Sequence, residues 1–352
     1  MGEKNIRAGL VGVTGYSGME MVRLLNGHPY MSLTRVTSRQ QAGQPLKKLF
    51  PYVQGLQCAD LAVSSPDTDD LAGNCDLVFL AVPHGAAMHL GARLFQAGIK
   101  VVDLSADFRL REASVYEEWY NLKHEQTVCL GHAVYGLPEL YAEKIKEASL
   151  IANPGCYPTS VIMALSPALR MDLVEREGII VDSKSGATGA GRSTKQTSLF
   201  CEVHDNFRAY NLGRHRHTPE IEQELSLVSG QKITISFNTH LLPTNRGILS
   251  TCYTRLKKQL SQAEIIAAYT EAFAGCPWVR VLPSGTLPET RWVRGSMFCD
   301  LGLVKDERTG GLTIVCAIDN LCRGASGQAL ANANLMFNLP IDAGLDPVPL
   351  VP

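Results

Sequence analysis

The chain has 352 residues, of which 45% are hydrophobic and 19% are charged, and its formal net charge at pH 7 is −1. This length exceeds what one ordinary hydrophobic core organises, so we expect two domains. The charges form no basic or acidic block, which argues against a nucleic-acid or membrane surface as the binding partner. No apolar run reaches the roughly 18 residues that would span a bilayer.

The N-terminus, MGEKNIRAGLVG, runs directly into an apparent strand, and we expect neither a signal peptide nor a transit sequence. The ten cysteines form no C-x-x-C pair, and several lie in or beside apolar strand-like segments. This pattern fits reduced, buried thiols better than a disulfide framework or a zinc site. We therefore expect a cytoplasmic protein.

Strand and helix signals alternate over the first 150 residues. An amphipathic segment at 17–26 predicts a helix between the first two strands, and the segment GAAMHLGARLFQAG predicts another between the third and the fourth. The predicted strands are 6–12, 32–38, 76–82, 99–104 and 149–152. This alternation predicts an α/β domain with a Rossmann-type, doubly wound parallel sheet.

The pattern changes after Cys156. A helix is predicted at 157–170, and only one further clear helix, at 261–274, lies among the strands that follow. The strand candidates are 178–183, 231–242, 248–255, 278–282, 296–304 and 312–318. They predict a second, α+β domain with a mainly antiparallel sheet.

The C-terminal segment GASGQALANANLMFNL is apolar at helical spacing, and its small residues suggest close packing against the first domain. The predicted domains are therefore a dinucleotide-binding domain and a catalytic domain. The first comprises residues 1–155 plus 325–352, and the second, which binds substrate and forms oligomers, comprises residues 156–324.

The turn after the first predicted strand reads GVTGYSG, a G-x-x-G-x-x-G pattern between a strand and a helix. Glycines here let the backbone approach a pyrophosphate, and the helix N-terminus offers N–H groups and a positive dipole end. Glycine turns are common, but this placement favours a dinucleotide site. The expected cofactor contacts are Gly12, Thr14, Gly15, Tyr16, Ser17 and Gly18.

The end of the second predicted strand bears on the type of cofactor. An NAD enzyme places a carboxylate there for the ribose 2′-hydroxyl, whereas this chain has Thr37-Ser38-Arg39. A hydroxyl and a guanidinium suit a 2′-phosphate, so we expect NADPH or NADP to bind through Ser38 and Arg39. The alternative is that Arg39 is an ordinary solvated loop residue.

The loops after the later strands are expected to face the same crevice, because ligands bind outside the carboxyl ends of parallel strands. These loops read AVPHG and DLSADFR. Turn and cap duty is the alternative for His84 and Asp107. The expected cofactor contacts are Pro83, His84 and Ser105, and the expected substrate contacts are Arg109 and Asn153.

The stretch IANPGCYPTSV, residues 151–161, sets Cys156 apart from the other cysteines. A proline-glycine turn precedes it and Pro158 opens the predicted helix, so Cys156 lies at a helix N-terminus. This position stabilises the thiolate, which is the nucleophilic form. Beside a hydride carrier, a thiolate can attack an activated carbonyl and form a thioester, which the hydride reduces to an aldehyde. The alternative is a small apolar plug.

This chemistry needs an acid/base group, and the candidates lie in AYNLGRHRHTPEIEQEL, residues 209–225. His215 or His217 can protonate the leaving oxygen or the developing hydroxyl. Glu220 can orient that imidazole and raise its pKa, or it can balance the dipole of a helix that starts at Thr218. An H-x-H pair can bind zinc, but no third ligand has convincing spacing, so we expect no metal.

A second glycine-rich run, SKSGATGAGRS at residues 183–193, can cradle an anion such as an acyl phosphate through backbone N–H groups. The alternative is a flexible loop. From this run we expect Ser185 and Gly186 to contact the cofactor. The expected substrate contacts are Thr188, Gly189 and Arg192, together with Tyr210 and Arg216 from the histidine segment.

Seven motifs occur in order: GVTGYSG, ADFR, YGLPEL, NPGCYPT, SGATGAGR, HRHTPEIEQ and AIDNLCRGASGQA. Together they closely resemble the N-acetyl-γ-glutamyl-phosphate reductase family, arginine-biosynthesis enzymes that share a superfamily with aspartate-semialdehyde dehydrogenase. The resemblance runs from residue 7 to about residue 338. It implies NADPH-dependent reductive dephosphorylation of N-acetyl-γ-glutamyl phosphate, giving N-acetylglutamate semialdehyde, NADP and phosphate.

The resemblance places the nucleophile at Cys156 and the acid/base in the HRH motif. We choose His217 over His215, because Glu220 follows His217 at helical spacing. The resemblance also implies cofactor-side contacts from Asn320 and from residues 324–327, and a homodimer or homotetramer.

Three alternatives stay open. A lysine-pathway enzyme, which reduces an α-aminoadipyl phosphate carried on an acidic protein, would need a basic entrance, and only Arg214-His215-Arg216 is basic here. The motifs of aspartate-semialdehyde dehydrogenase fit less well around the cysteine and the histidines. A catalytically silent NADP-binding regulator is disfavoured by the intact Cys156 and HRH motif. The expected partners are therefore a small acyl phosphate and inorganic phosphate.

Overall fold

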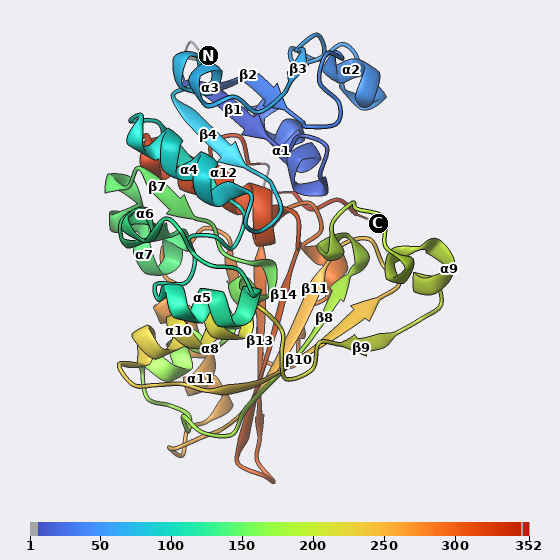
Figure 1. Cartoon of the computed structure of the whole chain (residues 1–352). Helices are drawn as coiled ribbons and strands as arrows, with labels where there is room; N and C mark the ends of the chain where they lie inside the picture. The colour runs from blue at the N-terminus through green and yellow to red at the C-terminus, as the bar shows by residue number, and fades with distance from the viewer. Residues whose placement is uncertain (1–5, 346–347, 352) are drawn as a thin grey trace. The chain divides into compact units, whose positions relative to one another are not determined.

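The computed structural model describes residues 6–345 and 348–351. The chain divides into two compact units, Met1–Pro154 with Ala325–Asp346 and Gly155–Gly324 with Pro347–Pro352 (Figure 1). The first boundary falls one residue before the predicted one, and residues 348–351 group with the second unit instead of the first. The role assigned to each unit stays a prediction.

The first unit is built on one parallel sheet of seven strands in the order β3-β2-β1-β4-β5-β7-β6. The strands are β1 Ile6–Val11, β2 Met31–Thr37, β3 Val63–Ser64, β4 Leu77–Leu80, β5 Lys100–Asp103, β6 Val134–Tyr135 and β7 Leu150–Ala152. The strand order reverses between β1 and β4, which confirms the predicted doubly wound sheet. The two-residue strands β3 and β6 are too short to leave a periodic pattern in the sequence.

The helices of the first unit are α1 Tyr16–Asn26, α2 Leu46–Leu49, α3 Thr68–Asn74, α4 Ala87–Gln96, α5 Ala113–Tyr120, α6 Thr127–His132, α7 Pro138–Glu147 and α12 Gly327–Met336, with the 3₁₀ turn η1 Pro51–Val53. Of these, α1, α3, α4, α7 and α12 contact strands of the sheet. The C-terminal helix α12 is buried along its whole length and contacts α1, α7 and β5. Its glycine, alanine and asparagine side chains permit this close approach.

The second unit contains a seven-stranded mixed sheet in the order β12-β13-β14-β11-β8-β10-β9. Its strands are β8 Ile179–Gly186, β9 Arg208–Tyr210, β10 Ile235–Leu242, β11 Ile248–Arg255, β12 Val279–Val281, β13 Cys299–Asp306 and β14 Gly311–Ile318. Strand β8 pairs in parallel with β10, as β12 does with β13, and the other four pairs are antiparallel. The predicted mainly antiparallel sheet is confirmed.

Helices cover one face of the second sheet. They are α8 Cys156–Arg170, α10 Thr218–Ser229 and α11 Gln262–Ala272, and a short helix α9 Phe200–Val203 lies in the segment before β9. The remaining turns are η2 Ala187–Ala190, η3 Gln196–Ser198, η4 Thr290–Trp292 and the π-helical turn η5 Cys322–Ser326. Helix α8 contacts β11, β13 and β14, and α10 packs on α8 and β10.

The prediction of only one clear helix among the strands of the second domain is wrong, because α10 forms another helix of 12 residues, although it begins at Thr218, as the sequence allowed. Its buried face carries Ile221 and Leu225 but also the carboxylates Glu220 and Glu224. Buried charges at helical spacing interrupt the apolar stripe from which a helix is predicted. The carboxylate of Glu220 accepts the backbone N–H of Gly155, a tertiary contact that sequence periodicity does not reveal, and Glu224 accepts from the neighbouring Gln223 side chain.

The cysteines follow the sequence prediction in part. None of the ten forms a disulfide, and seven of them are buried. The prediction of burial is wrong for Cys201, which is exposed on the short helix α9, and for Cys276, which is partly exposed in the turn after α11. In the described ranges, no helix is long and apolar enough to cross a bilayer.

Candidate active site

The glycine turn of the first unit has the geometry expected of a pyrophosphate-binding turn. Gly12 has a φ of +90°, and a side chain there would overlap the carbonyl oxygen of Ala81. A side chain on Gly18 would likewise overlap the carbonyl of Gly12. Helix α1 begins at Tyr16 after an N-cap glycine and has no acidic residue in its first turn, so the positive end of its dipole meets this turn. The turn therefore fits a dinucleotide, and Thr14, Gly15 and Ser17 are partly exposed beside it.

The two residues after β2 differ in exposure. Ser38 is buried and its backbone N–H donates to Ser64, whereas the side chain of Arg39 is exposed. The guanidinium of Arg39 is therefore accessible to a ligand, whereas Ser38 is enclosed in the interior of the unit.

Asp107 of the ADFR motif caps helix α4. Its carboxylate accepts hydrogen bonds from the backbone N–H groups of Gly85, Ala87 and Met88 at 2.7, 3.1 and 2.9 Å, and from the hydroxyl of Tyr116 at 2.8 Å. This is the cap duty that the sequence left open as an alternative. The carboxylate fixes the loop that carries the exposed residues Pro83 and His84.

A second hydrogen bond joins the loop of Pro83 and His84 to the loop that carries Asp107. The backbone N–H of Ala106 donates to the Nδ1 atom of His84 at 3.0 Å. Ser105 is buried, and its hydroxyl donates to Asp103 at 2.7 Å. Burial, reinforced by the neighbouring Asp107, raises the pKa of Asp103 to about 7.

Two residues predicted to bind substrate are buried in the first unit. The guanidinium of Arg109 donates to the carbonyl oxygens of Asn153 at 2.7 Å and Leu104 at 2.8 Å. The side chain of Asn153 donates to Ala325 at 3.1 Å and accepts from Asn332 at 3.0 Å. These contacts hold the ends of β5 and β7 together, and substrate binding by the two residues stays a prediction.

Cys156 is the first residue of α8, with Gly155 as the N-cap and no acidic residue in the first helical turn. It is partly exposed, whereas the rest of this helix is buried up to Leu169. The backbone N–H of Gly155 donates to the carboxylate of Glu220 at 2.8 Å. A Cβ placed on Gly324 would lie 2.7 Å from the Cβ of Cys156, so only glycine fits behind the thiol.

Aromatic and imidazole rings pack around Tyr157, the residue that follows Cys156. The ring centroid of Tyr157 lies 5.4 Å from that of His215, 6.1 Å from His217 and 5.6 Å from Phe237. The hydroxyls of Tyr157 and Tyr210 share a hydrogen bond of 2.9 Å. Burial raises the pKa of Tyr157 above its ordinary value and that of Tyr210 to about 12, so both hydroxyls stay protonated at neutral pH.

The two predicted acid/base histidines have different surroundings. His215 is 8% exposed, and its Nδ1 atom accepts the backbone N–H of His217 at 3.1 Å. Burial, reinforced by the charge of Arg216, lowers the pKa of His215 to about 4, so this imidazole is neutral at pH 7. His217 is the partly exposed N-cap residue of α10. The structure therefore makes His215 a fixed acceptor and leaves His217 the more accessible imidazole.

Glu220 was expected to orient an imidazole. The side chain is 1% exposed, and its hydrogen bond to Gly155 instead links the first turn of α10 to the N-cap of α8. This contact places Glu220 next to the backbone of the nucleophile segment. Its action on His217 stays a prediction.

The second glycine-rich run divides into a buried part and an exposed part. Strand β8 continues through Ser185 and Gly186, which are buried, so the loop begins later than predicted. Gly189 and Arg192 are exposed, as is Arg216 in the histidine segment. The exposed part is therefore accessible to an anion.

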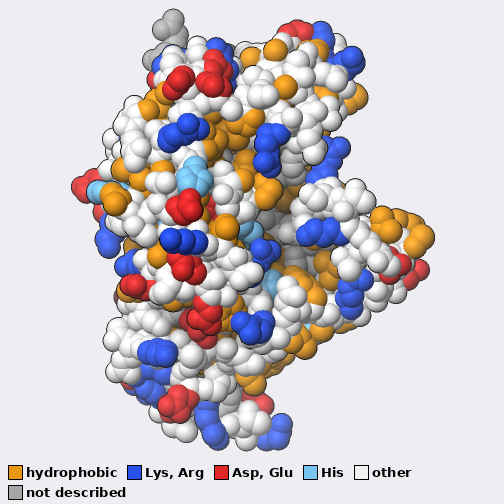
Figure 2. Space-filling view, in the orientation of Figure 1, with side chains coloured by type: hydrophobic (Ala, Val, Ile, Leu, Met, Phe, Trp, Pro, Cys, Tyr) orange, Lys and Arg blue, Asp and Glu red, His pale blue; other side chains and the backbone are white. Residues whose placement is uncertain are grey.

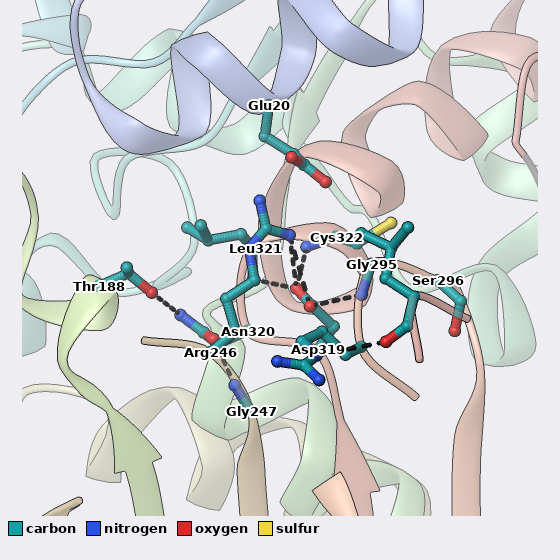
Figure 3. Close-up of polar contacts among 12 residues, drawn as sticks. Glu20, Thr188, Arg246, Gly247, Gly295, Ser296, Asp319, Asn320, Leu321 and Cys322 are labelled. Atoms are coloured by element: carbon teal, nitrogen blue, oxygen red, sulfur yellow. Dashed lines mark hydrogen bonds and ion pairs between the residues drawn. The ribbon is translucent and has the colours of Figure 1, made fainter. Parts of the chain in front are cut away.

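Asn320 and Asp319 follow β14 and are buried. Figure 3 shows their polar contacts with the backbone and side chains around them. Asp319 was not singled out from the sequence, although a polar pair directly after an apolar strand is a usable signal. Among the described residues, no group of three histidine, cysteine, aspartate or glutamate side chains could hold a metal ion.

Comparison with known proteins first defines the class. Residues 7–148 match the family model described as semialdehyde dehydrogenase, NAD binding domain, and residues 156–320 match the semialdehyde dehydrogenase dimerisation domain. Aspartate semialdehyde dehydrogenase II from Vibrio cholerae, in complex with ASA, has the same fold, with a TM-score of 0.71 at 15% identity, over 96% of this chain and 99% of that one. The enzyme from Candida albicans with NADP gives a TM-score of 0.67 at 17% identity, over 95% of this chain and 99% of that one.

Sequence relatives define the family more narrowly. N-acetyl-γ-glutamyl-phosphate reductase from Desulfotalea psychrophila is 50% identical over 99% of this chain and 100% of the relative. The protein of that name from Geobacter sulfurreducens is 49% identical over the same shares. The chain belongs to the N-acetyl-γ-glutamyl-phosphate reductase family.

The burial of neutral His215 predicts a pH-dependent stability. Below the ordinary pKa of 6.5 the unfolded chain binds a proton on this imidazole, whereas the folded chain binds it only below about pH 4. The free energy of unfolding should therefore fall as the pH drops from 6.5 to 4, by up to about 3 kcal/mol from this group. His215→Asn should remove that contribution in urea unfolding measured across this range.

The matched control is His204→Asn, at a histidine whose side chain is 57% exposed, which should leave the slope unchanged. Equal slopes for wild type and His215→Asn would show that the imidazole of His215 is not held neutral.

Proposed function

We propose that the chain catalyses NADPH-dependent reductive dephosphorylation of N-acetyl-γ-glutamyl phosphate to N-acetylglutamate 5-semialdehyde, a step of arginine biosynthesis. The names of relatives 46–50% identical over nearly the whole chain support this activity. The observation that carries the mechanism is the partly exposed Cys156 at the start of α8, beside the aromatic and histidine cluster.

The first half of the reaction is acyl transfer to sulfur. The positive end of the α8 dipole favours the thiolate of Cys156. The thiolate attacks the carbonyl carbon of the acyl phosphate, a C–S bond forms, and the C–O bond to phosphate breaks. Inorganic phosphate leaves with that electron pair, and the acyl group remains as a thioester.

His217 is the proposed proton carrier. It takes the proton that the thiol loses and returns a proton to the phosphate oxygen as that group leaves. NADPH, when bound, supplies the hydride that reduces the thioester carbonyl. After phosphate has left, a proton from water restores the imidazolium of His217. His217 then protonates the oxygen that the reduction makes negative, and it recovers the proton as the aldehyde forms and the thiolate leaves.

NADPH rather than NADH is the proposed cofactor. The glycine turn at Gly12 and Gly18 fits a pyrophosphate, and the family model for this part of the chain is described as NAD binding. The exposed guanidinium of Arg39 at the end of β2 suits a 2′-phosphate. We infer that the exposed loop residues Gly189 and Arg192 meet the phosphoryl group of the substrate.

A second copy of this chain is the proposed protein partner, in a homodimer or a tetramer built from dimers. The register aligns four residues on the sheet face opposite to α8, with Ile180 across from Tyr253, Tyr253 across from Thr313, and Thr313 across from Val304. Ile180, Tyr253 and Val304 are 44%, 43% and 42% exposed. An apolar row of this kind favours a protein interface, and the matching family model is described as a dimerisation domain.

Hydrophobic side chains also reach the surface around α9 (Figure 2). They include Leu199, Phe200 and Phe207.

We further propose that the protein works in the cytoplasm, because none of its ten cysteines forms a disulfide.

The first prediction concerns the nucleophile. The assay follows NADPH formation from N-acetylglutamate semialdehyde, phosphate and NADP, with NAD as the competing cofactor. Cys156→Ala should lower turnover by at least about 10³-fold, because no thioester can form, while NADPH binding measured by fluorescence persists.

The control for this prediction is Cys201→Ala, at the exposed cysteine on α9, which should keep its activity. Wild-type turnover in Cys156→Ala would exclude the thioester route.

The same assay tests the cofactor. A wild-type enzyme that is as active with NAD as with NADP would contradict the role given to Arg39.

The second prediction separates the two histidines. His217→Ala should lower kcat by about 10²-fold, the usual loss for a general acid/base. His215→Asn keeps an acceptor oxygen for the His217 N–H and should lower kcat by no more than about 5-fold. A larger loss in His215→Asn than in His217→Ala would reverse the assignment.

The third prediction concerns the second copy. Tyr253→Lys places a charge in the apolar row and should shift the chain, by sedimentation velocity, to a smaller assembly. Lys232→Ala, at an exposed position before β10, is the control and should leave the assembly unchanged. A wild-type chain that sediments as a 38.3 kDa monomer at micromolar concentration would contradict the proposed interface.

A further inference from the structure

Asn320 joins two segments of the second unit through both of its polar groups. The amide oxygen accepts the backbone N–H of Gly247 at 2.9 Å, and the amide nitrogen donates to the hydroxyl of Thr188 at 2.9 Å (Figure 3). That hydroxyl in turn donates to the carbonyl of Asn245 at 2.6 Å. The side chain of Asn320 is 2% exposed and its bond to Gly247 is buried, whereas its bond to Thr188 is partly buried and the bond from Thr188 to Asn245 is exposed.

The segment held by Thr188 is the start of the glycine-rich loop. The backbone N–H groups of Gly186, Ala187 and Thr188 donate to the carbonyls of the turn between β10 and β11, at 2.9, 2.8 and 3.2 Å. A Cβ on Gly186 would lie 2.7 Å from the carbonyl oxygen of Asn245. The loop is exposed beyond residue 188, so the bond from Asn320 lies where the fixed part of the loop ends.

The neighbouring residue Asp319 fixes the segment behind the thiol. Its fully buried carboxylate accepts the backbone N–H groups of Gly295, Leu321 and Cys322 at 2.7, 2.8 and 2.7 Å. Its backbone carbonyl accepts the N–H of Gly324 at 2.9 Å, and Gly324 packs directly against Cys156. The consecutive residues Asp319 and Asn320 therefore fix two segments at the same end of β14. One is the start of the glycine-rich loop, and the other is the segment at Gly324 that packs against Cys156.

We propose that Asn320 is a positioning residue, which sets the affinity for the phosphoryl group by holding residues 186–189 at a fixed place relative to Cys156. The inference rests on the proposed function, because the phosphoryl group is the anion that leaves beside that thiol. Both polar groups of Asn320 are bonded to protein, so the residue acts through Thr188. This role differs from the cofactor contact that the family resemblance implied for Asn320.

The test uses the reverse reaction, in which the Michaelis constants for phosphate and NADP are measured separately. Asn320→Ala should raise KM for inorganic phosphate by about 10-fold or more and change KM for NADP by less than about 3-fold. Thr188→Val removes the same hydrogen bond with little change in volume and should show the same split. The double variant should be no worse than Asn320→Ala, because the two residues act through one contact.

Thr188→Ser restores the hydroxyl and should recover most of the affinity lost in Thr188→Val. The control is Thr254→Val, whose hydroxyl donates to Leu312 at 2.8 Å at the other end of the same sheet, and which should match wild type. Thr188 is only partly buried, so its variants keep the test available if Asn320→Ala does not fold.

A second readout does not depend on turnover. Inorganic phosphate should slow alkylation of Cys156 by iodoacetamide, and Asn320→Ala should need about 10-fold more phosphate for the same protection. An unchanged KM for phosphate, or a larger rise in KM for NADP, would overturn the positioning role. Absence of phosphate-dependent turnover in the wild type would overturn the proposed function instead, and this inference with it.

Discussion

The N-terminus of α8 is the constraint on which the proposed chemistry depends. A cysteine at the first helical position gains from the helix dipole only if the backbone before it is held in place. The carboxylate of Glu220 holds that backbone by accepting the N–H of Gly155, and Gly324 closes the space behind the thiol. The position of the proposed nucleophile is thus fixed from two segments distant in sequence, and the side chain of Cys156 itself remains partly exposed.

Buried carboxylates that accept backbone N–H groups recur in both units. Asp107 fixes the loop between β4 and α4, and Asp319 fixes the segment after β14. Each carboxylate is fully buried and satisfies several donors at once, which offsets the cost of removing its charge from water. Loops that would otherwise sample many conformations are thereby held rigidly enough to present functional groups.

The sequence predicted most of the sheets, because their apolar segments are long and bounded by turn residues. For α10 it gave only a possible start at Thr218, because the inner face of this helix includes Glu220 and Glu224, and it missed the three-residue strand β9. It singled out Cys156, His215, His217 and Glu220. However, it expected Glu220 to act on His217, only three residues away in the sequence. The structure shows a bond from Glu220 to Gly155, 65 residues away, and local spacing carries no record of such a contact.

The sequence by itself determined the two-part architecture and the family and pointed to the candidate nucleophile Cys156, because glycine turns, helix starts and hydrophobic periodicity are local features. The tertiary structure alone decided how the polar residues are used. His215 is a buried neutral acceptor, Asp107 is a helix cap, and Asn320 is a bridge between two loops. Burial and long-range partners set these roles, and both depend on segments that meet only when the chain is folded.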